Sequence, residues 1–139
     1  MKIQYVTTDF EFESTENLDS IVQELGDSIV TQLNQWVDGK YRVSVSGTGS
    51  ELNFMPEQTI NEFCDAIERL SESSKTLLDR CLERVADIAF ESGSEPNHLT
   101  YRLPASLINR LSRLKISIAI TIYPIGTYTH EVKTANRQE

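Results

Sequence analysis

The chain has 139 residues, of which 39% are hydrophobic and 24% are charged, and its formal net charge is -8. This length fits one domain with a core of its own, and the composition excludes a disordered or fibrous protein. The acidic balance argues against nucleic acid and the membrane surface as partners, because both are bound through basic surfaces.

The acidic side chains are concentrated in the first part of the chain. Residues 1–100 hold 19 of the 21 acidic residues against seven basic ones, whereas residues 101–139 hold six basic residues against two acidic ones. A surface dominated by carboxylates attracts a basic protein. We therefore expect a basic protein partner, with no nucleic acid and no membrane.

No apolar run approaches the roughly 20 residues of a membrane span, and the N-terminal residues lack the apolar centre of a signal peptide. A cytoplasmic location is therefore expected. Cys64 and Cys81 both lie in amphipathic helical patterns, and without an export signal they are expected to be reduced rather than bridged.

The first part of the chain is predicted to form strand, helix and strand. Residues 3–13 alternate between apolar and polar side chains and predict a strand. Apolar residues at helical spacing over 18–36 predict one long helix, and the pair Asp38-Gly39 predicts the turn that follows it. Alternation over residues 40–47 predicts the next strand.

Two helices are predicted in the middle of the chain. Pro56 suits the first turn of a helix whose apolar stripe ends at Leu70. A shorter helix follows, with apolar residues between Leu77 and Leu82.

Residues 84–91 fit two patterns. Apolar residues from Leu82 to Ala89 would continue a helix, but the alternation of Ala86, Ile88 and Phe90 before a turn favours a strand. Residues 98–104 are then predicted to be its hairpin partner.

A helix and a strand are predicted at the end of the chain. Pro104 opens the helix, and residues 115–123 place isoleucine at every second position opposite small, semi-polar side chains. A strand of this kind fits a sheet covered by helices on one face only.

The predicted fold class is α/β (α+β), with the order βαβααββαβ. We expect a two-layer sandwich in which helices pack on one face of a mixed, largely antiparallel sheet. Residues 1–126 form the predicted single domain, and residues 127–139 form a predicted flexible C-terminal tail.

Three stretches, "TTDFEFES...LDSIV", "LLDRCLERVADIAFESG" and "LPASLINRLSRLKISIAITIYP", resemble a bacterial domain-of-unknown-function family, number 4279. The family pattern has an arginine, then Asp-Ile-Gly and an aromatic residue before a turn, and a last strand closed by tyrosine. The matching residues are Arg84, Asp87, Ile88, Phe90, Gly93 and Tyr123, with Ala89 where the family often has glycine. The resemblance implies an α/β fold without established enzymatic activity, similar to immunity proteins of contact-dependent and polymorphic toxins.

The first predicted strand carries a row of carboxylates. Asp9, Glu11 and Glu13 are spaced about 7 Å apart on one face, and Glu16 and Asp19 continue the row at the start of the next helix. The commoner explanation is a solvated strand face and favourable charges at a helix N-terminus. The functional explanation is a docking surface for a basic partner. No calcium-type loop accompanies the row, so no metal site is predicted.

Asp87, Glu91 and Tyr123 are further contact candidates. Asp87 belongs on the open sheet face, where the ordinary role of its carboxylate would be to pair with an arginine such as Arg80 or Arg102.

Catalysis is poorly supported by the sequence. His98 and His130 are the only histidines, and no paired Cys or His spacing suits zinc. We therefore expect no enzyme, no cofactor and no metal.

The predicted function is a bacterial immunity protein that neutralises a cognate toxin, for instance a basic nuclease, by covering its active surface with acidic side chains. The alternative is a small-molecule-sensing or regulatory domain that uses the open sheet face. The sequence leaves the oligomeric state open. The predicted contact residues are Asp9, Glu11, Glu13, Glu16, Asp19, Asp87, Glu91 and Tyr123.

Overall fold

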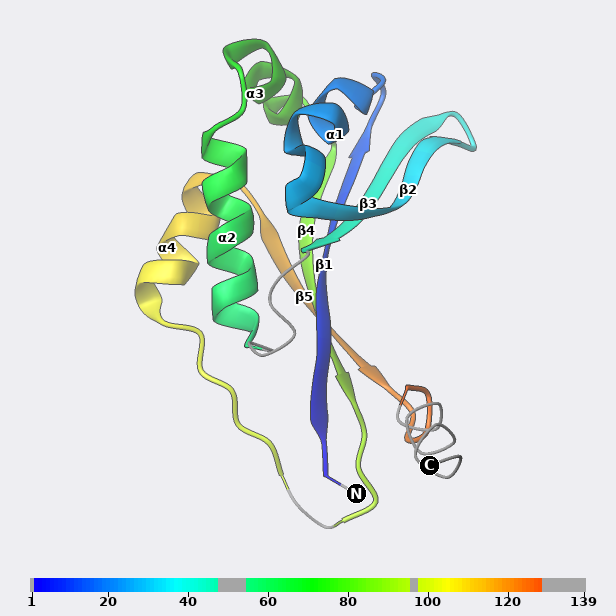
Figure 1. The fold of residues 1–139 in the computed structure, drawn as a ribbon, viewed down its shortest axis with the longest axis vertical. Helices are drawn as coiled ribbons and strands as arrows, with labels where there is room; N and C mark the ends of the chain where they lie inside the picture. The colour runs from blue at the N-terminus through cyan, green and yellow to red at the C-terminus, as the bar shows by residue number, and fades with distance from the viewer. Residues whose placement is uncertain (1, 48–54, 96–97, 129–139) are drawn as a thin grey trace.

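The computed structural model describes residues 2–47, 55–95 and 98–128. A five-stranded sheet runs through the molecule in the order β2-β3-β1-β4-β5, and only β4 and β5 are parallel (Figure 1). The strands are β1 (Gln4–Ser14), β2 (Ile29–Val37), β3 (Lys40–Gly47), β4 (Glu83–Glu91) and β5 (Ser117–Tyr123). The helices are α1 (Asp19–Leu25), the short 3-10 turn η1 (Gly26–Ser28), α2 (Pro56–Glu68), α3 (Glu72–Asp79) and α4 (Ala105–Arg113).

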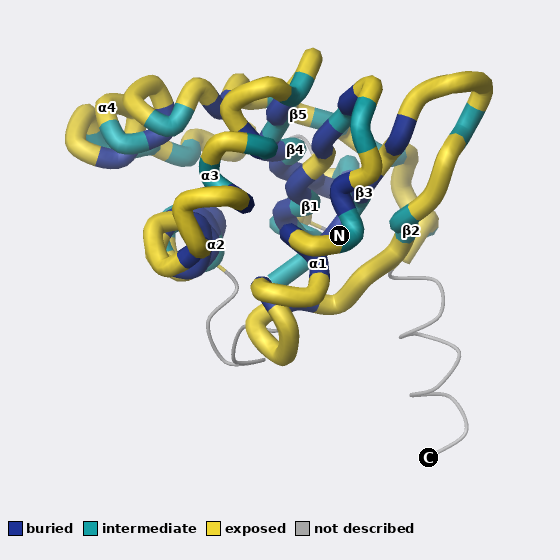
Figure 2. Tube along the Cα trace, turned by 90° about the horizontal axis from the view of Figure 1, so that it is seen from above, coloured by how far each residue is buried: buried dark blue, intermediate teal, exposed yellow. Residues whose placement is uncertain are grey.

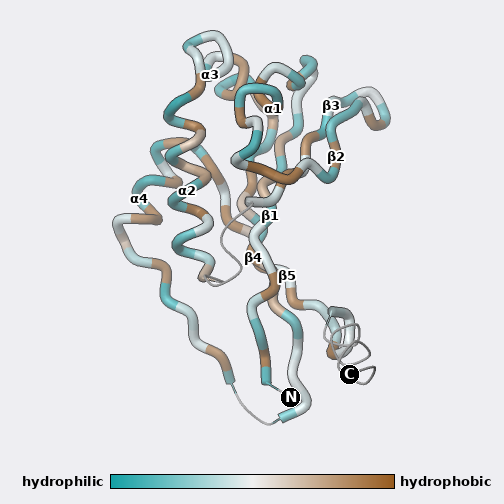
Figure 3. The backbone as a smooth tube through the Cα atoms, in the orientation of Figure 1, coloured by the Kyte–Doolittle hydropathy of each residue, from teal (hydrophilic) through white to brown (hydrophobic). Residues whose placement is uncertain are grey.

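The predicted α+β sandwich with a mixed, largely antiparallel sheet is confirmed. Buried positions lie between the central strands and the helices, as the view from above shows (Figure 2). Phe10 and Phe12 point from β1 into this layer, where Phe10 stacks on Phe63 of α2 with ring centroids 3.6 Å apart. In Figure 3, α2 changes between hydrophobic and hydrophilic along its turns, as a helix covering a core on one side does.

The long helix predicted over residues 18–36 is wrong in its second half. The helix α1 ends at Leu25, and Ile29–Val37 form strand β2, which pairs with β3 as a hairpin. Asp38 and Gly39 connect the two strands with φ of 51° and 83°. A two-residue hairpin turn of type I′ requires this left-handed backbone at both positions. Pairing with β3 therefore prevailed over the helical spacing of the apolar residues.

Residues 98–104 do not form the predicted hairpin partner of β4. Both edges of β4 are already occupied, by β1 and by β5. The segment instead leads without strand pairing into α4 (Figure 1).

The remaining predicted elements are confirmed, including the strand over residues 84–91. Cys81 and Leu82 were predicted in a helix but follow the end of α3 at Asp79. Cys64 and Cys81 are both free, and burial raises the pKa of each thiol to about 11. In the described part of the chain, every helix is too short or too polar to cross a membrane.

Candidate functional site

The predicted acidic row lies on the sheet face that the helices leave uncovered. Thr8, Phe10 and Phe12 are buried toward the helices, so the alternating residues Asp9 and Glu11 point to the opposite face. Glu13 continues the same row. Asp9, Glu11 and Glu13 are thus brought together on one face, as the alternation predicted.

The strand register adds two acidic side chains from β4. Asp9 is the direct cross-strand partner of Asp87, and Glu13 is the partner of Glu83. Side chains in such pairs have Cβ atoms about 5 Å apart, and like charges at this distance destabilise the sheet. The open face therefore carries two acid-acid pairs between β1 and β4.

In the pair of Glu13 and Glu83, the charge of Glu13 is compensated within the molecule. Lys40 Nζ and Arg42 Nε lie 3.2 Å and 3.3 Å from the Glu13 carboxylate. Glu16 is also paired, because Arg80 donates two hydrogen bonds to its carboxylate at 2.7 Å and 3.0 Å. These bonds lower the pKa of Glu16. Glu13 and Glu16 therefore offer less uncompensated charge than the sequence suggested.

Four carboxylates remain, those of Asp9, Glu11, Glu83 and Asp87, which we call the acidic cluster. Among the residues that the structure describes, no basic side chain forms an ion pair with them. One carboxylate oxygen of Asp9, Oδ1, is buried without a hydrogen-bond partner in the same part of the chain. The cluster is the region of the open face with uncompensated negative charge.

The electrostatic cost of the cluster appears in two pKa shifts. Burial raises the pKa of Asp9, repulsion by Asp87 adds to this effect, and a hydrogen bond from Gln32 opposes it. Burial also raises the pKa of Glu11, and the charges of Asp87, Asp9 and Glu83 raise it further. Both carboxylates are thus less stable in the charged form than isolated ones.

Asp87 lies on the open face as predicted, but the prediction that an arginine pairs with it is wrong. Thr121 of β5 donates a hydrogen bond to its carboxylate at 2.7 Å. Arg80 is engaged by Glu16 instead. The neighbouring Arg84 points to the helix side and donates to the carbonyl oxygen of Leu78 at 3.0 Å.

Asp19 is separate from the acidic cluster. Its carboxylate accepts a hydrogen bond from Asn34 at 2.8 Å, and Asn34 in turn accepts one from Tyr41 at 2.6 Å. Tyr41 is buried in the core. Asp19 therefore fastens α1 to the β2-β3 hairpin, and the structure does not bring it together with Asp9.

Glu91 and Tyr123 lie together at the far end of the open face, where residues 124–128 turn back over the sheet. Glu91 is only 1% exposed, and the backbone N–H of Tyr128 donates to its carboxylate. The rings of Tyr123 and Tyr128 pack edge to face, with their centroids 5.4 Å apart. Of the predicted tail, Thr127 and Tyr128 take part in this turn, and residues 129–139 lie outside the described residues.

Sequence reasoning missed Glu83, Gln32 and Thr121. Glu83 follows from the alternation that places Asp87 on the open face, since residues 83, 85 and 87 share one side of a strand. Gln32 was assigned to a helix, and the contact of Thr121 with Asp87 depends on the parallel register of β4 and β5. Neither has a signal in the local sequence.

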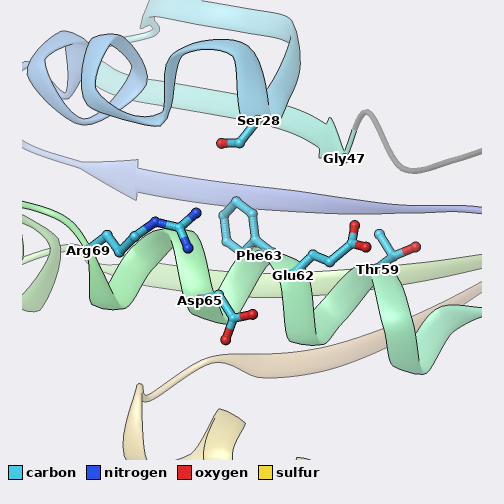
Figure 4. Close-up of a pocket in the computed structure, with 7 residues that line it drawn as sticks. All are labelled: Ser28, Gly47, Thr59, Glu62, Phe63, Asp65 and Arg69. Atoms are coloured by element: carbon cyan, nitrogen blue, oxygen red, sulfur yellow. The ribbon is translucent and has the colours of Figure 1, made fainter.

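In the described part of the chain, an apolar groove and a smaller pocket lie on the helix side. The apolar groove of about 290 Å³ lies beside the ends of β4 and β5 and is lined by Ile3, Ile88, Phe90, Leu99, Tyr101, Leu103, Ile120 and Ile122. The smaller pocket of about 220 Å³ beside α2 places Arg69 and Glu62 on either side of Phe63 (Figure 4). Its mixed charges favour neither an anion nor a cation.

The thiols lack the properties of a catalytic nucleophile. An activated cysteine has a lowered pKa, whereas burial raises the pKa of Cys64 and of Cys81. In residues 2–47, 55–95 and 98–128, no three His, Cys, Asp or Glu side chains are arranged to hold a metal ion.

The chain matches no model of a protein family, no curated protein and no solved structure. The resemblance to the bacterial family therefore remains a prediction, and the chemistry of the site must support any proposed function.

Proposed function

We propose that this protein is a non-catalytic binding protein, an immunity protein that neutralises a cognate bacterial toxin by covering its active surface. The observation that supports this proposal most is the acidic cluster on the uncovered face of β1 and β4. A toxin that binds nucleic acid has a basic surface, and such a surface complements the cluster.

The arrangement of charges favours binding over a purely solvated face. Lys40 and Arg42 compensate Glu13, whereas Asp9 and Asp87 face each other without a compensating cation in the described chain. Burial is the main cause of the raised pKa of Asp9, and a lysine or arginine of a partner placed between the two carboxylates would relieve the repulsion by Asp87 that adds to it. The free protein thus carries a repulsion between Asp9 and Asp87 that a basic partner would reduce.

The polar neighbours of the cluster suit a protein interface. Ser44 and Ser46 of β3 stand beside Glu11 and Asp9 on the open face. Their hydroxyl groups can donate or accept hydrogen bonds around a central charge contact. Neutralisation would be steric, because a sheet face laid over the toxin's active surface excludes the substrate. Long-range attraction would accelerate association.

The experiment measures binding kinetics with the C-terminal domain of the protein encoded immediately upstream. We expect the triple variant Asp9→Asn, Glu11→Gln, Asp87→Asn to associate at least about tenfold more slowly at low salt, because the steering charge is lost. The association rate of the wild type should fall steeply with salt concentration, and that of the variant should fall less.

A matched control separates the local effect from net charge. The variant Glu57→Gln, Glu62→Gln, Glu72→Gln removes the same charge from the helix layer and should bind like the wild type. Equal slowing by both triple variants, or an association rate that ignores salt, would contradict the acidic cluster as the docking site.

A second candidate, small-molecule sensing, is favoured by the apolar groove. Its volume of about 290 Å³ lies near the lower limit of ligand sites, and the residues that line it are apolar or aromatic. A panel of medium-chain fatty acids should then raise the melting temperature of the wild type. A variant with Leu103→Glu at the groove should lose this stabilisation, and no shift for any acid would reject the candidate.

A further inference from the structure

Strand β5 is an edge of the sheet, and its side chains do not protect that edge. Its neighbour in the sheet is β4, and no other strand of the described residues pairs with it, so within this part of the chain the other side of its backbone presents unpaired N–H and C=O groups. Edge strands of monomers are usually guarded by charges, proline or a bulge. The sequence SIAITIY contains neither a charge nor a proline, and its pairing with β4 is regular from Ser117 to Tyr123.

The opposite edge differs. Strand β2 has an irregular register between Thr31 and Leu33, where an extra residue interrupts the ladder with β3. A bulge of this kind twists an edge away from further pairing. The two edges of the sheet are therefore not equivalent, and β5 is the one suited to accept another strand.

The exposed side chains of β5 are aliphatic. Ile118, Ile120 and Ile122 share the helix-facing side of the strand, and they are 36%, 64% and 66% exposed. The helices gather over the other end of the sheet and leave the far end of β5 uncovered (Figure 1). Covering this stripe would remove apolar surface from water, which stabilises association.

The pattern of the strand identifies a second copy of this chain as its partner. When two β5 strands run antiparallel with Ile120 opposite Ile120 of the other copy, Ile118 lies opposite Ile122. Ala119 then lies opposite Thr121, so the isoleucines of both strands meet on one face. Cross-strand aliphatic pairs of this kind stabilise a sheet. The stripe is thus complementary to itself.

The surrounding charges fit the antiparallel direction. Residues 116–125 carry no charged side chain, so the pairing brings no like charges together although the chain is strongly acidic. The nearest basic residues precede the strand: Arg113 ends α4, and Lys115 lies between α4 and β5. An antiparallel pair keeps these two basic ends apart, whereas a parallel pair would place them side by side.

We propose that two copies of this protein associate through antiparallel pairing of β5 about Ile120, so that one continuous sheet runs through both. The two-fold axis stands perpendicular to the sheet. Both helix layers then lie on one side of the shared sheet and both acidic clusters on the other.

Sedimentation velocity over a hundredfold range of concentration tests the association. The wild type should approach twice the 15.8 kDa of the chain. Ile120→Lys should raise the dissociation constant of the dimer at least about tenfold, because two lysines would face each other across the new pair. Val30→Lys, at a residue of the other edge that is also half exposed, should leave the dimer unchanged.

Disulfide formation tests the register in a Cys81→Ser background. Ile120→Cys should cross-link under mild oxidation, because directly opposite residues have Cα atoms about 5 Å apart, within disulfide range. Ile118→Cys should not, since its two copies would be about 13 Å apart. The double variant Ile118→Cys, Ile122→Cys should cross-link again.

Three results would overturn the proposal. A wild type that stays monomeric over the whole range would show that the edge is covered by something else or by nothing. A dimer that survives Ile120→Lys would place the contact elsewhere. Efficient cross-linking of Ile118→Cys alone would exclude the register about Ile120.

Discussion

At the residue scale, the carboxylates that the sequence places on one face are not all free to contact a partner, because some are paired within the molecule. The sequence places Asp9, Glu11 and Glu13 on one face, and the structure agrees. It also shows that Lys40, from the far end of the β2-β3 hairpin, helps to neutralise Glu13. A salt bridge between residues distant in sequence depends on strand register, and alternation alone cannot reveal it. The available charge therefore lies between β1 and β4, toward Asp87, rather than along β1 into α1.

The carboxylate of Asp9 should cost the free protein stability. Because folding raises its pKa, the folded state holds this proton to higher pH than the unfolded state, and the resulting stabilisation is lost as pH rises through the folded pKa. We expect Asp9→Asn to raise the free energy of unfolding at pH 7 by roughly 0.2–1 kcal/mol, the range of a cross-strand charge pair.

Urea denaturation at pH 7 and pH 3 measures this effect. The advantage of Asp9→Asn should disappear at pH 3, below the ordinary pKa of aspartate, where the wild-type carboxyl is also protonated. Glu62→Gln, a change of equal charge on the exposed side of α2, should have little effect at either pH. A loss of stability for Asp9→Asn at pH 7 would contradict the pKa shift.

At the element scale, the spacing of apolar residues predicted a helix or strand correctly where it fitted only one of the two. The prediction failed where the spacing fitted both. Strand β1 and helix α2 each show one clear period, and both were predicted correctly. Residues 29–37 place apolar side chains at a spacing that a helix also uses, so only pairing with β3 decides their structure. The pairing of β4 with the distant β1 and β5 likewise has no counterpart in the local pattern that suggested a hairpin with residues 98–104.

Besides the buried apolar residues of helix α4, one arginine joins this helix to α2. Arg110 donates to Asp65, to Glu68 at 3.2 Å and 3.0 Å, and to the Asn61 side chain at 2.9 Å. Hydrogen bonds to Glu68 and Asp65 raise the pKa of Arg110, so it is charged at any pH of interest. Arg110→Ala should lower the free energy of unfolding by about 1–3 kcal/mol, because charge-assisted hydrogen bonds are lost.

Chemical denaturation of both variants with a matched control checks this prediction. Arg113→Ala removes the same charge from the same helix, and Arg113 is exposed. Its effect should stay within about 0.5 kcal/mol, as for most surface substitutions. Equal losses for Arg110→Ala and Arg113→Ala would mean that helix charge, rather than the contact with α2, determines stability.

At the scale of the whole molecule, the sequence predicted that helices cover only one face of the sheet. It did not predict how much of that face they cover. The semi-polar side of residues 117–123 indicated a sheet open on one face, which is the arrangement found. The isoleucines of β5 point to the helix side but stay exposed, and only Ile116, just before the strand, is buried in the core. Which part of a strand a helix covers depends on how the connecting segments run, and residues 98–104 give no pattern that fixes it.

The strand order also has a consequence for how the chain acquires its structure. Strand β1 is the first to be synthesised, yet it occupies the middle of the sheet, with Gln4 paired to Glu91. A nascent chain cannot complete this pairing until β4 has left the ribosome. Until then, the edge of β1 that will pair with β4 has no partner strand. Contacts this far apart in sequence slow folding, and deleting the first residues would divide the sheet rather than trim its border.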